Sequence, residues 1–215
     1  MKPKEELLVV SFLLFLVIVT GGCAAGNKYN YRDVAANIST SGAQAISVAT
    51  HHQRKYVISG EKAPHYVGVQ RGGFGNPFNV STESGKPLAD DMTVAITASL
   101  AKKGFRAIPV VVLYSENTVS VYEKLKKSAA EIYVLLMLNE WISDTYTNVG
   151  LNYDMTLKVL GKDASTIAGK KIKGEDNLGG SAFNPTAHAK KAVPEAFGKK
   201  IEELFNSPEI AEALQ

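Results

Sequence analysis

Short strand patterns and one helix follow each other in the first half of the chain. Apolar and polar residues alternate at 45–50, 55–59 and 65–70, where Tyr and β-branched residues are prominent, so each segment predicts a strand. Residues 71–78 contain three glycines and one proline in eight positions, which indicates a loop with a positive φ at one or more glycines. Apolar residues at i, i+4, i+7 and i+8 within 88–100 are typical of the packed face of a helix.

The second half of the chain has longer patterns. They predict, in order, a buried strand at 108–114, a short helix at 121–130, a long strand at 131–146, a strand with one solvated face at 151–159, a further strand at 167–173 and helical structure over 186–214. The sequence therefore predicts an α+β fold, with a mixed or mostly antiparallel sheet and two or three helices packed on one face.

A different pattern opens the chain and indicates export from the cytoplasm. Lys2 and Lys4 precede an apolar run at 7–19, and small residues follow up to Cys23, which is the arrangement of a signal peptide. The run has thirteen residues. As a helix it would span about 20 Å, less than a hydrocarbon core of about 30 Å, so a permanent membrane span is the weaker interpretation.

The residues TGGC, at 20–23, resemble a bacterial lipobox, in which the cysteine is acylated and becomes the first residue after cleavage. Thr20 stands where Leu is usual. The alternative is an ordinary cleaved signal peptide with an incidental Cys23. Several acyl chains would hold the protein on a membrane essentially permanently. Ala24 is not the Asp that disfavours export to the outer membrane, so we expect a lipid-anchored protein on the periplasmic face of the outer membrane.

These observations divide the chain into three parts. Residues 1–22 are expected to be a lipoprotein signal peptide, residues 23–41 the acylated Cys and a flexible tether without sustained apolar period, and residues 42–215 one periplasmic domain. Such a tether would reach a few tens of ångströms from the bilayer at about 5 to 6 Å times the square root of its length.

Composition and motifs exclude several classes of function. A net charge of +3 is too small for a dedicated nucleic-acid binder, and the single cysteine excludes an intramolecular disulfide. The sequence contains neither GxSxG nor HExxH, and the adjacent His51 and His52 would point to opposite faces of a strand. We therefore expect no catalytic residues, no metal and no cofactor, and a protein that is not an enzyme.

The glycine-rich segment 71–78 is the candidate contact with a protein partner. It carries Arg71, Phe74, Asn76 and Phe78, and Arg and aromatic residues are the types that anchor protein interfaces. A purely structural loop and a small-ligand site formed by backbone N–H groups are the alternatives.

Several segments together resemble the YajG-type small Gram-negative lipoproteins, over roughly residues 40–215. They are the lipobox-like TGGC, ATHHQR with YVISG after it, LADDMTVAITASLAKKGF, EIYVLLMLNEWISDTYTNVGLNYDMTLKVL and KKIEELFNSPEIAEAL. The resemblance implies an envelope protein with an α/β domain akin to those of other periplasmic assembly proteins, and it implies no catalytic residue.

The expected function is that of a non-enzymatic scaffold or accessory subunit of an envelope assembly, such as a secretion or transport machine. Its expected partners are the membrane, through N-terminal acyl chains, and other envelope proteins. The alternative is a small-ligand or lipid-binding module with an apolar groove between the sheet and the C-terminal helix.

Overall fold

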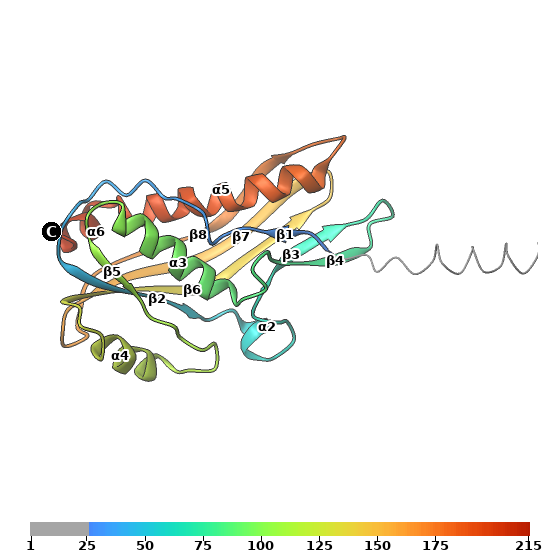
Figure 1. Ribbon diagram of the computed structural model, residues 1–215. Coiled ribbons are helices and arrows are strands. Elements are labelled where there is room, and N and C mark those ends of the chain that lie inside the picture. Colours follow the sequence, from blue (N-terminus) through green and yellow to red (C-terminus); the bar gives the residue numbers. More distant parts are fainter. Residues whose placement is uncertain (1–25) are drawn as a thin grey trace, which may run out of the picture.

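One long strand, β6 (Ile132–Thr145), organises the sheet. The structure is a computed structural model that describes residues 26–215. On one side of β6, the strands β7 (Asn148–Leu160) and β8 (Thr166–Gly180) continue as an antiparallel meander (Figure 1). The expected signal peptide and Cys23 lie outside the described residues.

The other side of β6 is shared by two separate branches of the sheet. The first half of β6 pairs in parallel with β2 (Ala45–His52), which pairs onward with β5 (Arg106–Pro109). The last residues of β6 pair in parallel with β3 (Tyr66–Arg71), followed by β4 (Pro77–Thr82) and β1 (Lys28–Tyr29). The sheet is therefore forked, and residues 139–142 of β6 lie at the fork.

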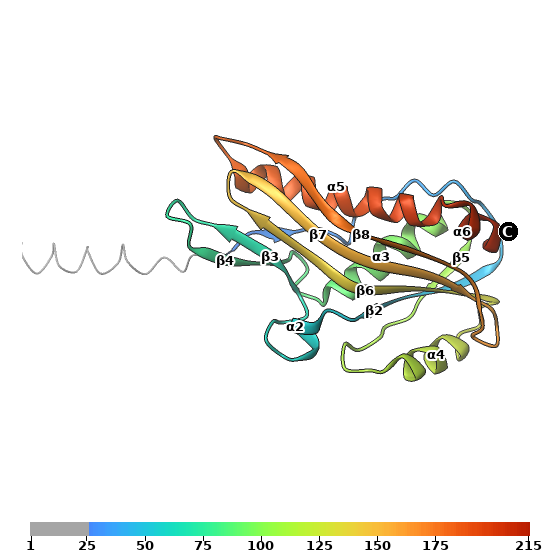
Figure 2. The ribbon, with the colours of Figure 1, turned by 180° about the vertical axis from the view of Figure 1, so that it is seen from behind.

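Helices cover the two faces of the sheet unequally. On one face lie α3 (Leu88–Ala101), α5 (Pro185–Phe205) and α6 (Pro208–Ala213), whose apolar residues share a core with Ile46 and Val134. On the other face, α4 (Thr118–Lys126) packs on Ala45, Ala49 and Leu135 (Figures 1 and 2). The remaining helix, α2 (Lys55–Ile58), is a single turn after β2.

The structure confirms an α+β fold with a mixed sheet, and it differs from the sequence prediction in detail. Four of the seven strand pairings are parallel, so the sheet is not mostly antiparallel by number of pairings, although the two longest pairings are antiparallel. Three helices lie on one face as expected, but α4 lies on the opposite face. The strand predicted at 55–59 is wrong, because this segment forms α2.

Residues 26–41 belong to the folded domain, although the sequence analysis placed them in a flexible tether. Tyr29, Tyr31 and Ile38 are fully buried. The segment runs between two helices: the N–H of Ala36 donates to Ser99 Oγ of α3, and the N–H of Asn37 donates to Glu202 Oε1 of α5. Its apolar residues fill the space between helices and sheet, and this burial gives the segment a fixed path that its irregular sequence pattern did not reveal.

Among the helices of residues 26–215, none has the length and apolar character needed to cross a membrane.

Candidate functional site

The chain enters the domain beside the glycine-rich hairpin. Strand β1 runs parallel to β4, with Lys28 opposite Ser81 and Tyr29 opposite Thr82. Upstream of β1, a Cβ atom on Gly26 would lie 1.7 Å from the carbonyl oxygen of Asn79, so only glycine fits there. The N-terminal part of the chain is therefore held against the β3–β4 hairpin from Gly26 onward.

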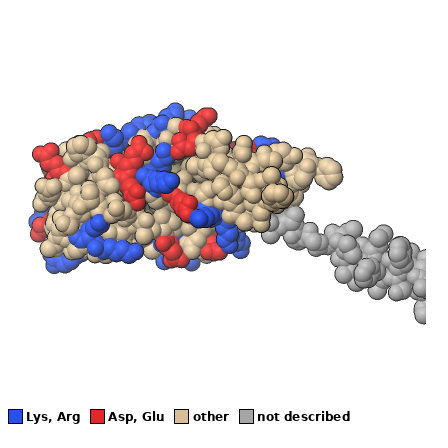
Figure 3. Space-filling model, turned by 90° about the horizontal axis from the view of Figure 1, so that it is seen from above, with Lys and Arg blue, Asp and Glu red and all other residues tan. Residues whose placement is uncertain are grey.

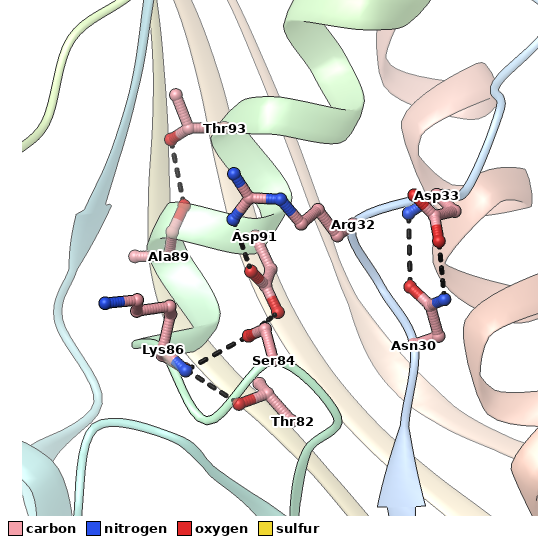
Figure 4. Close-up of polar contacts among 9 residues, drawn as sticks. All are labelled: Asn30, Arg32, Asp33, Thr82, Ser84, Lys86, Ala89, Asp91 and Thr93. Carbon is pink, nitrogen blue, oxygen red and sulfur yellow. Dashed lines mark hydrogen bonds and ion pairs between the residues drawn. The ribbon is translucent and has the colours of Figure 1, made fainter.

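A buried carboxylate fastens this segment to the start of α3 (Figure 4). Arg32 Nη1 donates to Asp91 Oδ1 at 3.3 Å, and Ser84 Oγ donates to Asp91 Oδ2 at 2.6 Å. Asp91 is buried in the first turn of α3, where a negative charge is favoured by the helix dipole. Burial raises the pKa of Asp91 above its usual range, and the hydrogen bonds from Ser84 and Arg32 oppose that rise. The same contacts fix the direction in which the segment crosses the sheet.

Aromatic packing completes the attachment. The ring of Tyr31 packs edge to face on Trp141 of β6 and on Phe197 of α5, with centroids 6.2 Å and 5.7 Å apart. The indole Nε1 of Trp141 donates to Tyr31 Oη at 2.8 Å. Since all three side chains are essentially fully buried, the space expected for an apolar ligand between the sheet and α5 is filled by the protein's own side chains.

Two hollows beside this packed core have largely polar walls. One of about 580 Å³ lies between β8 and α5, and Asp176, His188 and Lys200 are among its lining residues. Another, of about 780 Å³, lies on the opposite side of the meander and is lined in part by Glu140 and Asp154. Neither has the apolar lining that a lipid-binding groove requires.

The four residues predicted as a partner contact lie on the β3–β4 hairpin but do not form one patch. Phe74 sits at the tip with its side chain fully in solvent, at 103% relative exposure, and Asn76 is exposed beside it. Phe78 is half-buried and lies back over the hairpin, close to Gly72. Arg71 forms a two-bond ion pair with Asp144 of β6, at 2.9 and 2.5 Å, which ties the hairpin to the end of β6.

The hairpin turn itself depends on glycine. Gly75 has a φ of +80°, in the region that side chains disfavour. The N–H of Gly72 donates to the carbonyl of Asn76 at 2.9 Å, and the N–H of Gly75 donates to the carbonyl of Gly72 at 2.8 Å. These bonds close a tight turn that leaves Phe74 without a neighbouring core to enter.

Two further aromatic residues that the sequence analysis did not select lie at the same end of the molecule. Tyr146, in the β6–β7 turn, is 49% exposed, and Phe183, between β8 and α5, is 101% exposed. The turns are joined, since the N–H of Ser181 donates to the carbonyl of Thr147. Figures 1 and 2 both show these turns and the β3–β4 hairpin at the end where the chain enters. We call the loops 72–78, 145–150 and 177–184 together the aromatic end.

The aromatic end is free of charged residues. None of its three loops contains Asp, Glu, Lys or Arg. At the opposite end of the sheet the connecting segments carry such residues, as in KKGFR at 102–106 and GKDAS at 161–165. Figure 3 shows the same contrast, with a mostly uncharged surface next to the entering chain and Lys, Arg, Asp and Glu over the rest of that view. This shared lack of charge is the sequence signal that could have grouped the three loops.

A buried polar cluster occupies the fork of the sheet. Arg54 follows β2 and is fully buried. Its Nη1 donates to the carbonyls of Tyr66 at 2.8 Å and Trp141 at 3.0 Å, and its Nη2 donates to the carbonyl of Pro64 at 3.3 Å. The guanidinium thus satisfies backbone carbonyls where the branches of the sheet separate. Tyr56 lies beside it and donates from Oη to Glu140 Oε1 at 2.5 Å.

His52 completes this cluster in its neutral form. Arg54 can only donate, so His52 Nε2 accepts its hydrogen bonds and carries no proton. Burial, together with the charge of Arg54, lowers the pKa of His52 to about 3. Because these polar groups bind one another and the backbone, the cluster serves to hold the fork together.

Among the described residues no group of three His, Cys, Asp or Glu side chains is placed to hold a metal ion.

The neutral state of His52 predicts a pH-dependent stability. In the unfolded chain a histidine titrates near 6.5, so between about pH 3 and 6.5 the unfolded state binds more protons and stability falls as the pH falls. As the pH is lowered from about 6.5, we expect the free energy of unfolding to fall more steeply in the natural protein than in His52→Gln. The difference between the two is up to about 1.4 kcal/mol per pH unit. Urea unfolding at several pH values, followed by the fluorescence of Trp141, measures this difference. An equal dependence of the free energy of unfolding on pH in the two proteins would contradict the prediction.

Comparison with known proteins identifies the fold but no family. No family model matches the chain, and no curated protein matches it. Protein XCC0632 from Xanthomonas campestris, which is assigned to the family DUF330, superimposes with a TM-score of 0.54 over 88% of this chain and 96% of that one. This chain has that protein's fold. The sequence identity is 14%, so the likeness concerns the fold alone.

Two further solved structures match less well. PelC from Paraburkholderia phytofirmans, solved as a dodecamer, has a TM-score of 0.39 and 9% identity over 80% of this chain and 95% of that one. Lipoprotein GNA1162 from Neisseria meningitidis has a TM-score of 0.30 and 7% identity over 74% of this chain and 99% of that one.

Proposed function

We propose that this chain is a lipid-anchored envelope protein that holds a folded domain directly against the outer membrane. In this role it acts as a non-enzymatic scaffold or accessory subunit of an envelope assembly, such as a secretion or transport machine. The observation that carries the proposal is the docking of Gly26 on Asn79, because the fold begins three residues after the lipobox-like Cys23.

The length of chain between anchor and domain decides how the domain is held. Three residues of fully extended chain reach at most about 11 Å, against a few tens of ångströms for a flexible tether to residue 41. An acylated Cys23 would therefore keep the domain at the bilayer surface. A subunit with a fixed distance from the membrane is suited to assemble with other proteins in the same plane.

The buried polar groups support a structural role for the interior. Arg54 and His52 bind each other and the backbone at the fork, and Asp91 binds Arg32 and Ser84. These are the groups whose burial would otherwise suggest chemistry. Each of them has a partner whose loss would weaken the fold, so function is more readily placed on the surface.

One edge of the sheet offers a surface for a protein partner. Among the described strands, β8 pairs with β7 alone and is fifteen residues long. A partner can add a strand to such an edge, while charges such as Lys171 and Lys173 restrict which strand fits.

We also propose, from the resemblance in element order, that the chain is related to the YajG-type lipoproteins.

The test is a crosslinking pull-down from membranes with a C-terminally tagged chain. We expect a reproducible set of envelope proteins from the natural chain and its loss or reduction with Cys23→Ser, because the acyl anchor cannot form on serine. Mass spectrometry of the natural protein should show the added acyl mass.

A matched variant separates anchoring from distance. A flexible glycine and serine insertion between Ala25 and Gly26 keeps the lipobox and the fold but lengthens the reach. We expect it to remain on membranes and to lose part of the crosslinked set. An empty pull-down with the natural chain, or no acyl mass on it, would contradict the proposal.

A further inference from the structure

We propose that the aromatic end is a membrane-contact surface, with Phe74, Tyr146 and Phe183 set into the interfacial region of the same bilayer that holds the acyl anchor. This inference deepens the proposed function and rests on the acylation of Cys23. It assigns the tip of the glycine-rich hairpin to lipid, whereas the sequence analysis assigned it to a protein partner.

The direction of the chain places the bilayer at this end. Strand β1 runs parallel to β4, and β4 begins at the hairpin tip, so the chain upstream of β1 starts out toward that tip. Gly26 lies beside Asn79, three residues along β4 from Asn76. Those three positions span about 10 Å of strand, which is nearly the full reach of about 11 Å for the three residue steps from Cys23 to Gly26. An anchored chain therefore brings the hairpin tip to the lipid surface.

The exposure of the aromatic residues fits this position. Phe74 and Phe183 expose their whole side chains, at 103% and 101%, although the domain buries most of its other large apolar residues. They lie on separate turns, and Tyr146, which is 49% exposed, lies on a third turn. Phe and Tyr at loop tips suit the interfacial layer of a membrane, where an apolar ring is buried and a hydroxyl can stay hydrated.

The absence of charge from the three loops is the second observation. Residues 72–78, 145–150 and 177–184 contain no Asp, Glu, Lys or Arg, and the adjacent Arg71 is neutralised by Asp144. A charged group near the hydrocarbon boundary is costly, whereas amides and hydroxyls such as those of Asn76 and Ser181 can bind headgroups and water. In a protein interface charged residues are depleted at the core while the rim is polar and solvent-accessible, whereas these three loops carry no charge at any position. Lipid is therefore the occupant that the composition favours.

The experiment uses the tryptophan count of the chain. The sequence has one tryptophan, Trp141, which is fully buried. Phe74→Trp, Tyr146→Trp and Phe183→Trp each add a reporter at the aromatic end, and Ile167→Trp adds one at an exposed position near the opposite end of β8. Each acylated full chain is reconstituted into vesicles of phosphatidylethanolamine and phosphatidylglycerol, with and without bromine on part of the acyl chains.

We expect the three tip tryptophans to lose emission in the brominated vesicles and to shift to shorter wavelength on reconstitution. Trp141 in the natural chain and the tryptophan of Ile167→Trp should do neither. The substitutions are at exposed positions, and a circular dichroism spectrum equal to that of the natural chain verifies that each variant retains the fold.

The outcomes separate this inference from the proposed function. If the purified natural chain carries no acyl mass and does not float with vesicles, the proposed function fails. If the chain is acylated and floats but the tip tryptophans are not quenched, only the membrane contact is overturned. Quenching at position 74 alone would overturn the three-loop surface. Tip tryptophans whose emission shifts to shorter wavelength only when a protein binds would assign the aromatic end to that protein.

Discussion

Replacing Arg54 with Leu should remove a large part of the stability of the fold. The substitution removes the Arg54 donor from the buried carbonyls of Tyr66 and Trp141, whereas the carbonyl of Pro64 keeps the N–H of Leu88, and each unsatisfied buried group costs about 1 to 3 kcal/mol. For these two groups the expected loss is about 2 to 6 kcal/mol, a large part of the about 5 to 15 kcal/mol typical of a domain. Urea unfolding, followed by Trp141 fluorescence, measures it.

Two variants show which property of Arg54 matters. Arg54→Lys keeps the positive charge but offers a single nitrogen in place of the fork of donors, so most of the loss should persist. Lys55→Gln changes the next residue, which is exposed, and should leave the free energy of unfolding within about 0.5 kcal/mol. If Arg54→Leu were as stable as Lys55→Gln, the guanidinium would not be what holds the fork.

Tyr31→Ala should also destabilise the domain severely, by about 3 to 5 kcal/mol, as expected when a buried aromatic side chain is removed from a core. The ring lies between Trp141 and Phe197, and its hydroxyl accepts the hydrogen bond of the indole. Tyr31→Phe keeps the ring but leaves the indole N–H unpaired, so a smaller loss of about 1 to 3 kcal/mol is expected.

The comparison that decides the role of residues 26–41 uses an exposed tyrosine. Tyr114→Ala removes a partly exposed ring and should change stability by at most about 0.5 kcal/mol. Thermal or urea unfolding of Tyr31→Ala, Tyr31→Phe and Tyr114→Ala gives the order of their stabilities. A Tyr31→Ala protein as stable as Tyr114→Ala would mean that the segment is a tether after all.

Long patterns in the sequence predicted their elements well, and short ones did so less reliably: the strands predicted at 45–50 and 65–70 are present, whereas the one at 55–59 is not. The strands β6 and β7 and the helices α3 and α5 each carry a sustained period, so their places were predicted within a few residues. Residues 55–59 alternate over only five positions. They form a helical turn because the chain after β2 must bring Arg54 into the fork, which depends on β3 and β6.

Residues 26–41 show why burial can escape a sequence analysis. Tyr29 and Tyr31 have the spacing of a strand and Ile38 follows at a helical spacing of seven, so neither period is repeated and no sustained pattern appears. Their packing is set by Trp141 and Phe197, which are distant in sequence. Only the fold brings these partners together.

The candidate site was predicted in part. The glycine-rich turn and the exposure of its Phe74 follow from local sequence, because glycines at 72, 73 and 75 allow a tight turn and give the ring nothing to pack on. Tyr146 and Phe183 lie far along the chain, and they reach the same end only through the pairing of β6 with β7 and of β7 with β8.

The parallel alignment of β1 with β4 also determines how the domain would respond to mechanical force. If Cys23 is acylated as proposed, a pull away from the membrane would load the Lys28–Tyr29 pairing along the strand axis, so its bonds would be sheared together and would not be peeled apart one at a time. The rings of Tyr29, in β1, and of Tyr31, just after it, are enclosed by the core and oppose sliding. Under force, the N-terminal segment would detach from the domain only at the rate at which the core opens. The domain could therefore carry load as part of a larger assembly.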